Sequence, residues 1–210
     1  MRVNFFKIFA KIEELAASEQ TVNARMCEII RLCSRDVQHA DWAELSALDY
    51  DADVASLALW IQGVFERNPA PFPIQGLWIG LFNPCAGRKV WADMYVGALS
   101  QYTPDDDGHR WLWEGQSHYP PNADANSTSL RRIYEIGYDR TDGLGNTAEE
   151  PLCLAFGVFA VQQLLRGQST RLVGSTAPRI GVVVGFDSGD MLKLGELTDN
   201  GFVDASKASL

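Results

Sequence analysis

No run of apolar residues in this 210-residue sequence approaches the roughly 18 positions that a membrane-spanning helix needs. Residues 1–20 also lack the unbroken apolar core of a signal peptide, because charged side chains recur every few positions. We therefore expect a soluble, cytoplasmic protein with no membrane partner.

The sequence has no surplus of basic residues either. It carries 27 Asp and Glu against 18 Lys and Arg, which gives a net charge of −9. The acidic excess lies within residues 1–150, since residues 151–210 carry five acidic and five basic side chains. Such a chain is repelled by phosphate backbones and by anionic lipid, so we expect no nucleic-acid partner. A basic protein would be attracted to it.

Cysteine is scarce, and the common catalytic and ligand motifs are absent. The four cysteines contain no C-x-x-C pair, which argues against a disulfide framework and favours buried thiols in a reducing compartment. The sequence has no H-E-x-x-H, no G-x-S-x-G, no P-loop lysine and no G-x-G-x-x-G. It therefore predicts no cofactor and no metal centre. These absences do not exclude an enzyme, because catalytic groups are assembled across a fold.

What is present is an ordinary globular balance of 46% apolar and 21% charged residues, enough for one domain with a full core. Apolar residues recur at helical spacing over residues 3–17, 21–37 and 51–68, where Asp51 is suited to cap the third helix. The sequence NPAPFP then ends the helical pattern. We expect a single domain over residues 1–210, with residues 1–68 as a possible helical subdomain.

The pattern changes after residue 75. Aromatic and β-branched segments at 76–82 and 89–99 predict one hairpin, and those at 180–186 and 191–197 predict a second. Helices are expected at 130–138 and 148–167, and the tail after residue 197 is expected to fray. The fold class is therefore α+β: N-terminal helices followed by a mainly antiparallel sheet of two β-hairpins, with two further helices packed on it.

A long loop-like segment, residues 102–129, combines acids with large aromatic side chains. Aromatic anchors among charged residues are typical of a protein-binding surface. We take the candidate binding residues to be Asp105, Asp106, Asp107, Trp111, Trp113, Glu114 and Tyr119. In the alternative, Trp111 and Trp113 pack inward beneath the loop. The acids and the two histidines of this loop resemble a set of metal ligands, but their spacing matches no known metal site.

Cys153 is the residue that an enzyme hypothesis would use. A thiol in the first turn of a helix gains nucleophilicity, and His109 or His118 could serve as its base. Glu149 and Glu150 lie just before it and disfavour a thiolate. A buried core thiol is therefore the preferred interpretation of Cys153, and the protein is more plausibly a binding protein than an enzyme.

The segment Asp187-Ser-Gly-Asp190 joins the two strands of the second predicted hairpin. Ser-Gly at its centre supplies the backbone conformation that a tight turn needs. A calcium loop would require more oxygen ligands at alternating positions. The sequence therefore favours a turn, with a ligand site as the alternative.

Three segments resemble parts of bacterial proteins of unassigned function: GLWIGLFNPCAGRKVWADMYVGALSQY, EEPLCLAFGVFAVQQLL and VVVGFDSGDMLKLGEL. In general character the chain is similar to immunity proteins of bacterial toxin–immunity systems, which are small, acidic, cytoplasmic and rich in aromatic residues. The resemblance assigns no individual site residue. It implies a protein that binds a toxin domain, and the net charge of −9 makes a basic toxin or effector domain the expected partner. A cysteine hydrolase and a small-ligand or metal-binding domain remain alternatives, and the sequence leaves the oligomeric state open.

Overall fold

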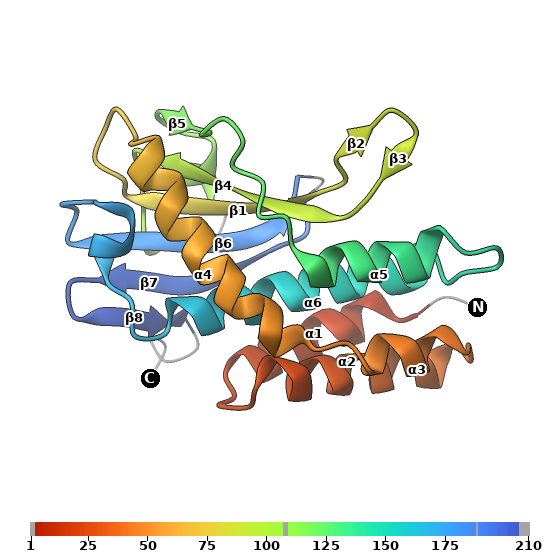
Figure 1. The fold of residues 1–210 in the computed structure, drawn as a ribbon. Helices are drawn as coiled ribbons and strands as arrows, with labels where there is room; N and C mark the ends of the chain where they lie inside the picture. The colour runs from red at the N-terminus through yellow and green to blue at the C-terminus, as the bar shows by residue number, and fades with distance from the viewer. Residues whose placement is uncertain (1–2, 107–108, 188, 206–210) are drawn as a thin grey trace.

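A computed structural model describes residues 3–106, 109–187 and 189–205 and places the helices on one side of a β-sheet (Figure 1). The helices are α1 (Phe5–Ala16), α2 (Val22–Asp36), α3 (Asp41–Ser46), α4 (Tyr50–Arg67), α5 (Thr128–Tyr138) and α6 (Asn146–Leu165). Two 3₁₀ helices are η1 (Arg110–Leu112) and η2 (Thr170–Val173). The strands are β1 (Gly76–Phe82), β2 (Cys85–Ala86), β3 (Lys89–Val90), β4 (Asp93–Leu99), β5 (Ser117–His118), β6 (Arg179–Phe186), β7 (Met191–Thr198) and β8 (Gly201–Asp204).

The main sheet has the strand order β5-β4-β1-β6-β7-β8. The two expected hairpins, β1–β4 and β6–β7, are both antiparallel. They join through β1 and β6, which run parallel, with Leu77 beside Val182 and Gly80 beside Gly185. Parallel neighbours need a long connection between them, and here α5 and α6 lie in that connection. The predicted α+β class with a mainly antiparallel sheet is confirmed; the parallel junction is an addition to it.

Alternate residues of each strand face opposite sides of the sheet. Leu77, Ile79 and Leu81 of β1 belong to the core beneath the helices, on what we call the inner face. Trp78 lies on the opposite, outer face, in a smaller apolar cluster with Leu99, Trp111 and Val183. The sheet is therefore covered on both sides, by helices on one and by a loop on the other.

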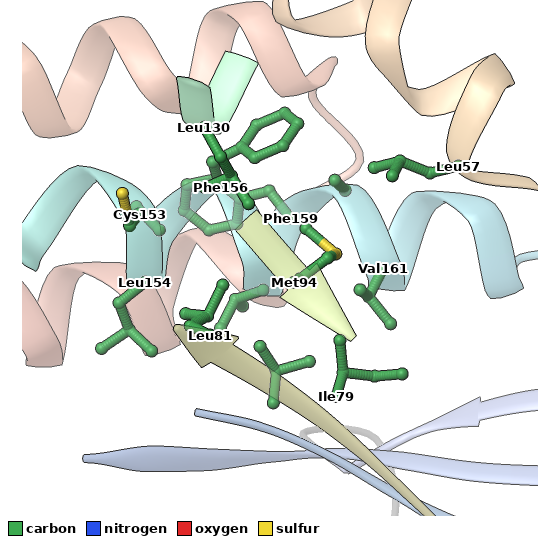
Figure 2. Close-up of a cluster of buried hydrophobic side chains, with 14 of the residues drawn as sticks. Leu57, Ile79, Leu81, Met94, Leu130, Cys153, Leu154, Phe156, Phe159 and Val161 are labelled. Atoms are coloured by element: carbon green, nitrogen blue, oxygen red, sulfur yellow. The ribbon is translucent and has the colours of Figure 1, made fainter. Parts of the chain in front are cut away.

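Helix α6 lies at the centre of the inner layer. It contacts β1, β6 and β7 on one side and α1, α2, α4 and α5 on the other, which matches its apolar character all round. Figure 2 shows Phe156 and Phe159 of α6 packed close to Leu81 and Met94 of the sheet. The core around α6 includes residues from α1 to β7, so the N-terminal helices share it with the sheet.

Polar side chains set the starts of several helices. Asn4, Thr21, Asp49 and Ser127 each accept a hydrogen bond from the backbone N–H three residues ahead. The prediction that Asp51 caps the third helix is wrong, because Asp49 does so. Asp51 accepts a hydrogen bond of 2.8 Å from the backbone N–H of Val22 and ties the start of α4 to that of α2.

Several short elements were not expected from the sequence. Strands β2 and β3 form a separate two-stranded sheet, so the predicted strand over residues 89–99 is wrong at its start, because β4 begins at Asp93. Helix α3 is held by Arg140, which binds Asp41 at 2.9 Å and also pairs with Glu44. Strand β5 pairs with β4 and forms one edge of the main sheet. Strand β8 pairs with β7, so the prediction that the tail frays is wrong for residues 201–204; residues 206–210 lie outside the described part.

Among the helices of the described residues, none combines the length and the apolar character that crossing a bilayer requires.

Candidate functional site

The loop that was expected to form a docking face covers part of the outer face of the sheet. Trp111 is 1% exposed and lies against Tyr102, with the ring centroids 4.9 Å apart and the planes at 85°. It shields the apolar side chains that the outer face would otherwise present to water. The structure therefore removes Trp111 from the proposed docking surface. Trp113, two residues further on, is 70% exposed.

The acids of the same loop have differing roles. Asp106 accepts a hydrogen bond of 2.7 Å from the backbone N–H of Arg110 and holds the start of η1. Asp105 and Glu114 are exposed, whereas Asp107 lies outside the described residues. Within the described part of the chain, no three His, Cys, Asp or Glu side chains come together as metal ligands.

The outer face is hollowed beside the exposed end of this loop. Two adjoining hollows, about 340 and 150 Å³, share Tyr95, Tyr119 and Asp187 in their walls; together we call them the aromatic cleft. The larger hollow is also lined by Phe82, Val96, Pro120, Asn122, Ala123 and Asp124. The smaller is also lined by Trp78, Leu112, Trp113, Phe186, Gly189 and Met191. Of the sequence-predicted binding residues, the structure brings Trp113 and Tyr119 together here.

A chain of hydrogen bonds runs through the floor of the cleft. The indole N–H of Trp78 donates to the hydroxyl of Tyr95 at 3.0 Å, and that hydroxyl donates to Oδ1 of Asp187 at 2.7 Å. Burial, reinforced by the bond to Asp187, raises the pKa of Tyr95 above its ordinary value, so its phenol remains a hydrogen-bond donor well above neutral pH. Each bond polarises the next, and the chain ends on a carboxylate that is exposed to solvent.

Glycines in the strands make room for the rings. A side chain at Gly80 would place its Cβ 2.3 Å from the ring of Tyr95, and one at Gly97 would place it 2.5 Å from Tyr119. In the register, Gly80 pairs with Tyr95 and Gly97 with Trp78. The rings therefore lie flat against the strands. Sequence reasoning missed Tyr95 and Trp78, although glycines alternating with aromatic residues in both strands could have indicated them.

The turn from Asp187 to Asp190 joins β6 to β7 as expected. The N–H of Phe186 donates to the carbonyl of Asp190 at 2.9 Å, and the N–H of Gly189 donates to the carbonyl of Phe186 at 3.0 Å. Gly189 has a φ of +124°, which suits glycine. The turn also has a second role that the sequence did not show, because Asp187 ends the hydrogen-bond chain of the aromatic cleft.

Cys153 does not lie in the first turn of its helix, because α6 begins at Asn146. The thiol is buried in the apolar core among the neighbours shown in Figure 2. Burial, with a smaller contribution from Glu149, raises the pKa of Cys153 well above its usual value. The thiol is therefore protonated and shielded, and the premise of an N-terminal, activated cysteine is wrong.

The two candidate histidines lie in the segment between β4 and α5. His118 is on the edge strand β5, with Nε2 3.3 Å from the carbonyl oxygen of Asn68. His109 lies just before η1 with a φ of +51°. Neither residue belongs to the core elements that surround Cys153, so the structure offers no assembled cysteine–histidine pair among these candidates.

A hollow larger than either of the two in the aromatic cleft lies elsewhere. It measures about 600 Å³ and is bounded by the last turns of α4, residues 69–74 and residues 167–176. Two of its polar side chains, Gln62 and Glu66, bond each other at 2.9 Å. We regard it as a surface depression between two loops, because neither of its two aromatic side chains, Phe65 and Phe72, is exposed as Trp113 and Tyr119 are in the aromatic cleft.

No protein-family model matches this sequence, and the comparisons with curated proteins and with solved structures returned no significant match. The chemistry of the aromatic cleft is therefore the basis for a functional conclusion.

Proposed function

We propose that this protein is a binding protein that holds a basic partner protein against the aromatic cleft and its acidic rim. One observation carries the proposal: Trp113 and Tyr119, 70% and 52% exposed, border a hollow that also contains the carboxylate of Asp187. Exposed aromatic rings beside a concave surface are the residues that most often anchor a protein–protein interface.

The charge of the chain supports a basic partner. The net charge is −9, and the exposed acids Asp124, Asp187 and Asp190 lie in or next to the cleft. A negative surface of this kind attracts a basic protein over a distance and accelerates its association. The partner is an effector or toxin domain in this proposal, and binding neutralises it by covering its functional surface, in the manner of the immunity proteins that the sequence resembles.

A pull-down with the full chain, followed by quantitative binding to each protein recovered, tests the proposal. We expect a basic protein that binds more weakly at moderate salt than at low salt, because charge pairs across the rim are screened. Trp113→Ala with Tyr119→Ala should abolish its capture. Phe6→Ala is the matched control, since Phe6 is an aromatic residue 91% exposed on α1.

The proposal fails if the recovered proteins bind the double variant and the wild type equally well. It also fails if binding does not depend on salt, because the acidic rim would then have no part in it.

A further inference from the structure

Asp187 is bonded at one of its two carboxylate oxygens. Its Oδ1 accepts the Tyr95 hydroxyl, and no described residue donates to Oδ2. The carboxylate lies where the two hollows of the aromatic cleft meet. The bond to Tyr95 orients the carboxylate, and its second oxygen can accept a hydrogen bond from a ligand.

Three of the rings around Asp187 are held by ring contacts with Tyr95 at their centre. Tyr95 meets Tyr119 at a centroid distance of 5.9 Å and an angle of 63°, and it meets Phe82 at 5.3 Å and 86°. These edge-to-face contacts hold the rings in place, while Tyr119 and Trp113 keep much of their surface open to solvent. The faces of tyrosine and tryptophan rings attract cations.

We propose that the aromatic cleft receives one arginine side chain of the basic partner. The guanidinium lies against the exposed rings of Tyr119 and Trp113 and donates to the free oxygen of Asp187. This inference rests on the proposed function and names the group that the cleft recognises.

Charge complementarity selects this occupant. An apolar side chain would cover Asp187 without offering it a donor, and that costs free energy. An anion would be repelled by Asp187 and Asp124. A guanidinium is planar, weakly hydrated and able to stack on a ring while it donates in its own plane, whereas an ammonium is compact and strongly hydrated. A slot of about 150 Å³ between rings therefore suits arginine better than lysine.

The test uses NMR with the full chain labelled at its tryptophan indole nitrogens. Three capped tripeptides, Gly-Arg-Gly, Gly-Lys-Gly and Gly-citrulline-Gly, are titrated to roughly 20 mM, which detects even millimolar binding. We expect the arginine peptide to shift the indole signals of Trp78 and Trp113. The indole signal of Trp42 should not move, because its N–H donates to the carbonyl of Val37 in the helical layer. The lysine peptide should bind several-fold more weakly, and the uncharged citrulline peptide weakest of all.

Asp187→Asn should weaken binding of the arginine peptide roughly tenfold. Asp139→Asn is the matched control, because it removes the same charge from an exposed carboxylate at the end of α5, outside the aromatic cleft. Equal binding of the arginine and citrulline peptides, no shift at all, or equal losses in both variants would overturn the inference. A stronger response to lysine would replace guanidinium with ammonium recognition and would also overturn it.

The two proposals fail separately. If a basic partner is captured through Trp113 and Tyr119 but arginine peptides show no preference for the cleft, only the arginine inference is lost. If the peptides bind as expected but no basic protein does, the cleft is a receptor for a small guanidinium ligand and the protein-binding proposal is lost.

Discussion

The hydroxyl of Tyr95 on β4 donates a 2.7 Å hydrogen bond to Asp187 at the end of β6, across 92 positions of sequence. This bond joins the two hairpins of the sheet on the outer face, next to the point where β1 and β6 run parallel. The aromatic cleft exists because that junction brings the ring of one hairpin to the turn of the other. Its geometry therefore depends on the same contacts that hold the sheet together.

Tyr95→Phe removes the hydroxyl that links the indole of Trp78 to the carboxylate of Asp187. The indole N–H of Trp78, which is 8% exposed, then loses its acceptor, and Asp187 loses its anchor. We expect a loss of about 1–2 kcal/mol in the free energy of unfolding, measured by urea denaturation. Tyr119→Phe is the control and should change stability by less than about 0.5 kcal/mol, because its side chain is half exposed. Equal losses of stability in the two variants would contradict a stabilising role for the Trp78–Tyr95–Asp187 hydrogen bonds.

Gly181→Ala tests the close approach of a ring to the outer face. The new Cβ would lie 2.1 Å from the ring of Tyr102. That ring cannot swing away easily, because its hydroxyl donates to Glu196 at 2.6 Å. We expect a cost of about 1–3 kcal/mol.

A double-mutant cycle separates this clash from other effects of the substitution. In a Tyr102→Ala background, Gly181→Ala should cost much less, which appears as a coupling energy between the two sites. Gly63→Ala in α4 is the comparison, since its nearest neighbour is the flexible end of Arg67 and alanine favours a helix. A similar cost in both backgrounds would show that the ring is not the cause.

The sequence predicted the longer elements because they repeat a local pattern. Helices α1, α2 and α4 and the hairpin strands each carry several turns or alternations of apolar residues. Their positions agree with the prediction, except that β4 begins at Asp93 and not at residue 89. Helix α3 is short and is held by Arg140, a residue about 100 positions away, so no local pattern indicates it. Strand β8 was missed for the same reason, because it is defined by its pairing with β7.

The candidate site was predictable only in part. Trp113 and Tyr119 were among the predicted binding residues because large aromatic residues beside acids in a loop suggest binding. Trp111 lies two residues from Trp113 but is buried. This difference in burial depends on the 3₁₀ helix η1 and on the apolar outer face beneath it. Tyr95 and Asp187 meet through the parallel pairing of β1 and β6, and nothing local in either segment reveals that contact.

Glu149 gives a prediction about pH. It lies in the first turn of α6, is 7% exposed and accepts one bond from Asn83 at 3.0 Å. Burial raises its pKa above the ordinary value of 4.5, and the Asn83 bond only partly offsets this. The folded state therefore holds the proton more tightly than the unfolded state, and the ionised form opposes folding above the folded pKa.

Glu149→Gln should therefore stabilise the protein at pH 7, by an amount on the order of 1 kcal/mol. The gain should shrink as the pH falls through the raised pKa and vanish below about 4, where the wild-type side chain is protonated in both states. Urea unfolding at pH 7, 5.5 and about 4 measures it. Glu114→Gln in the exposed loop is the control, and a gain independent of pH would contradict the assignment.

Cys153 gives a chemical test of whether a nucleophilic thiol exists. Cys27 and Cys85 are exposed, whereas Cys33 and Cys153 are buried, and burial raises the pKa of Cys33 to about 12. Because iodoacetamide reacts with the thiolate, we expect mass spectrometry to find Cys27 and Cys85 alkylated in the native protein. Cys33 and Cys153 should react only in denaturant, since their exposure requires the core to open. Native labelling of Cys153 as fast as that of Cys85 would show an accessible thiolate and would favour the cysteine hydrolase over the buried core thiol.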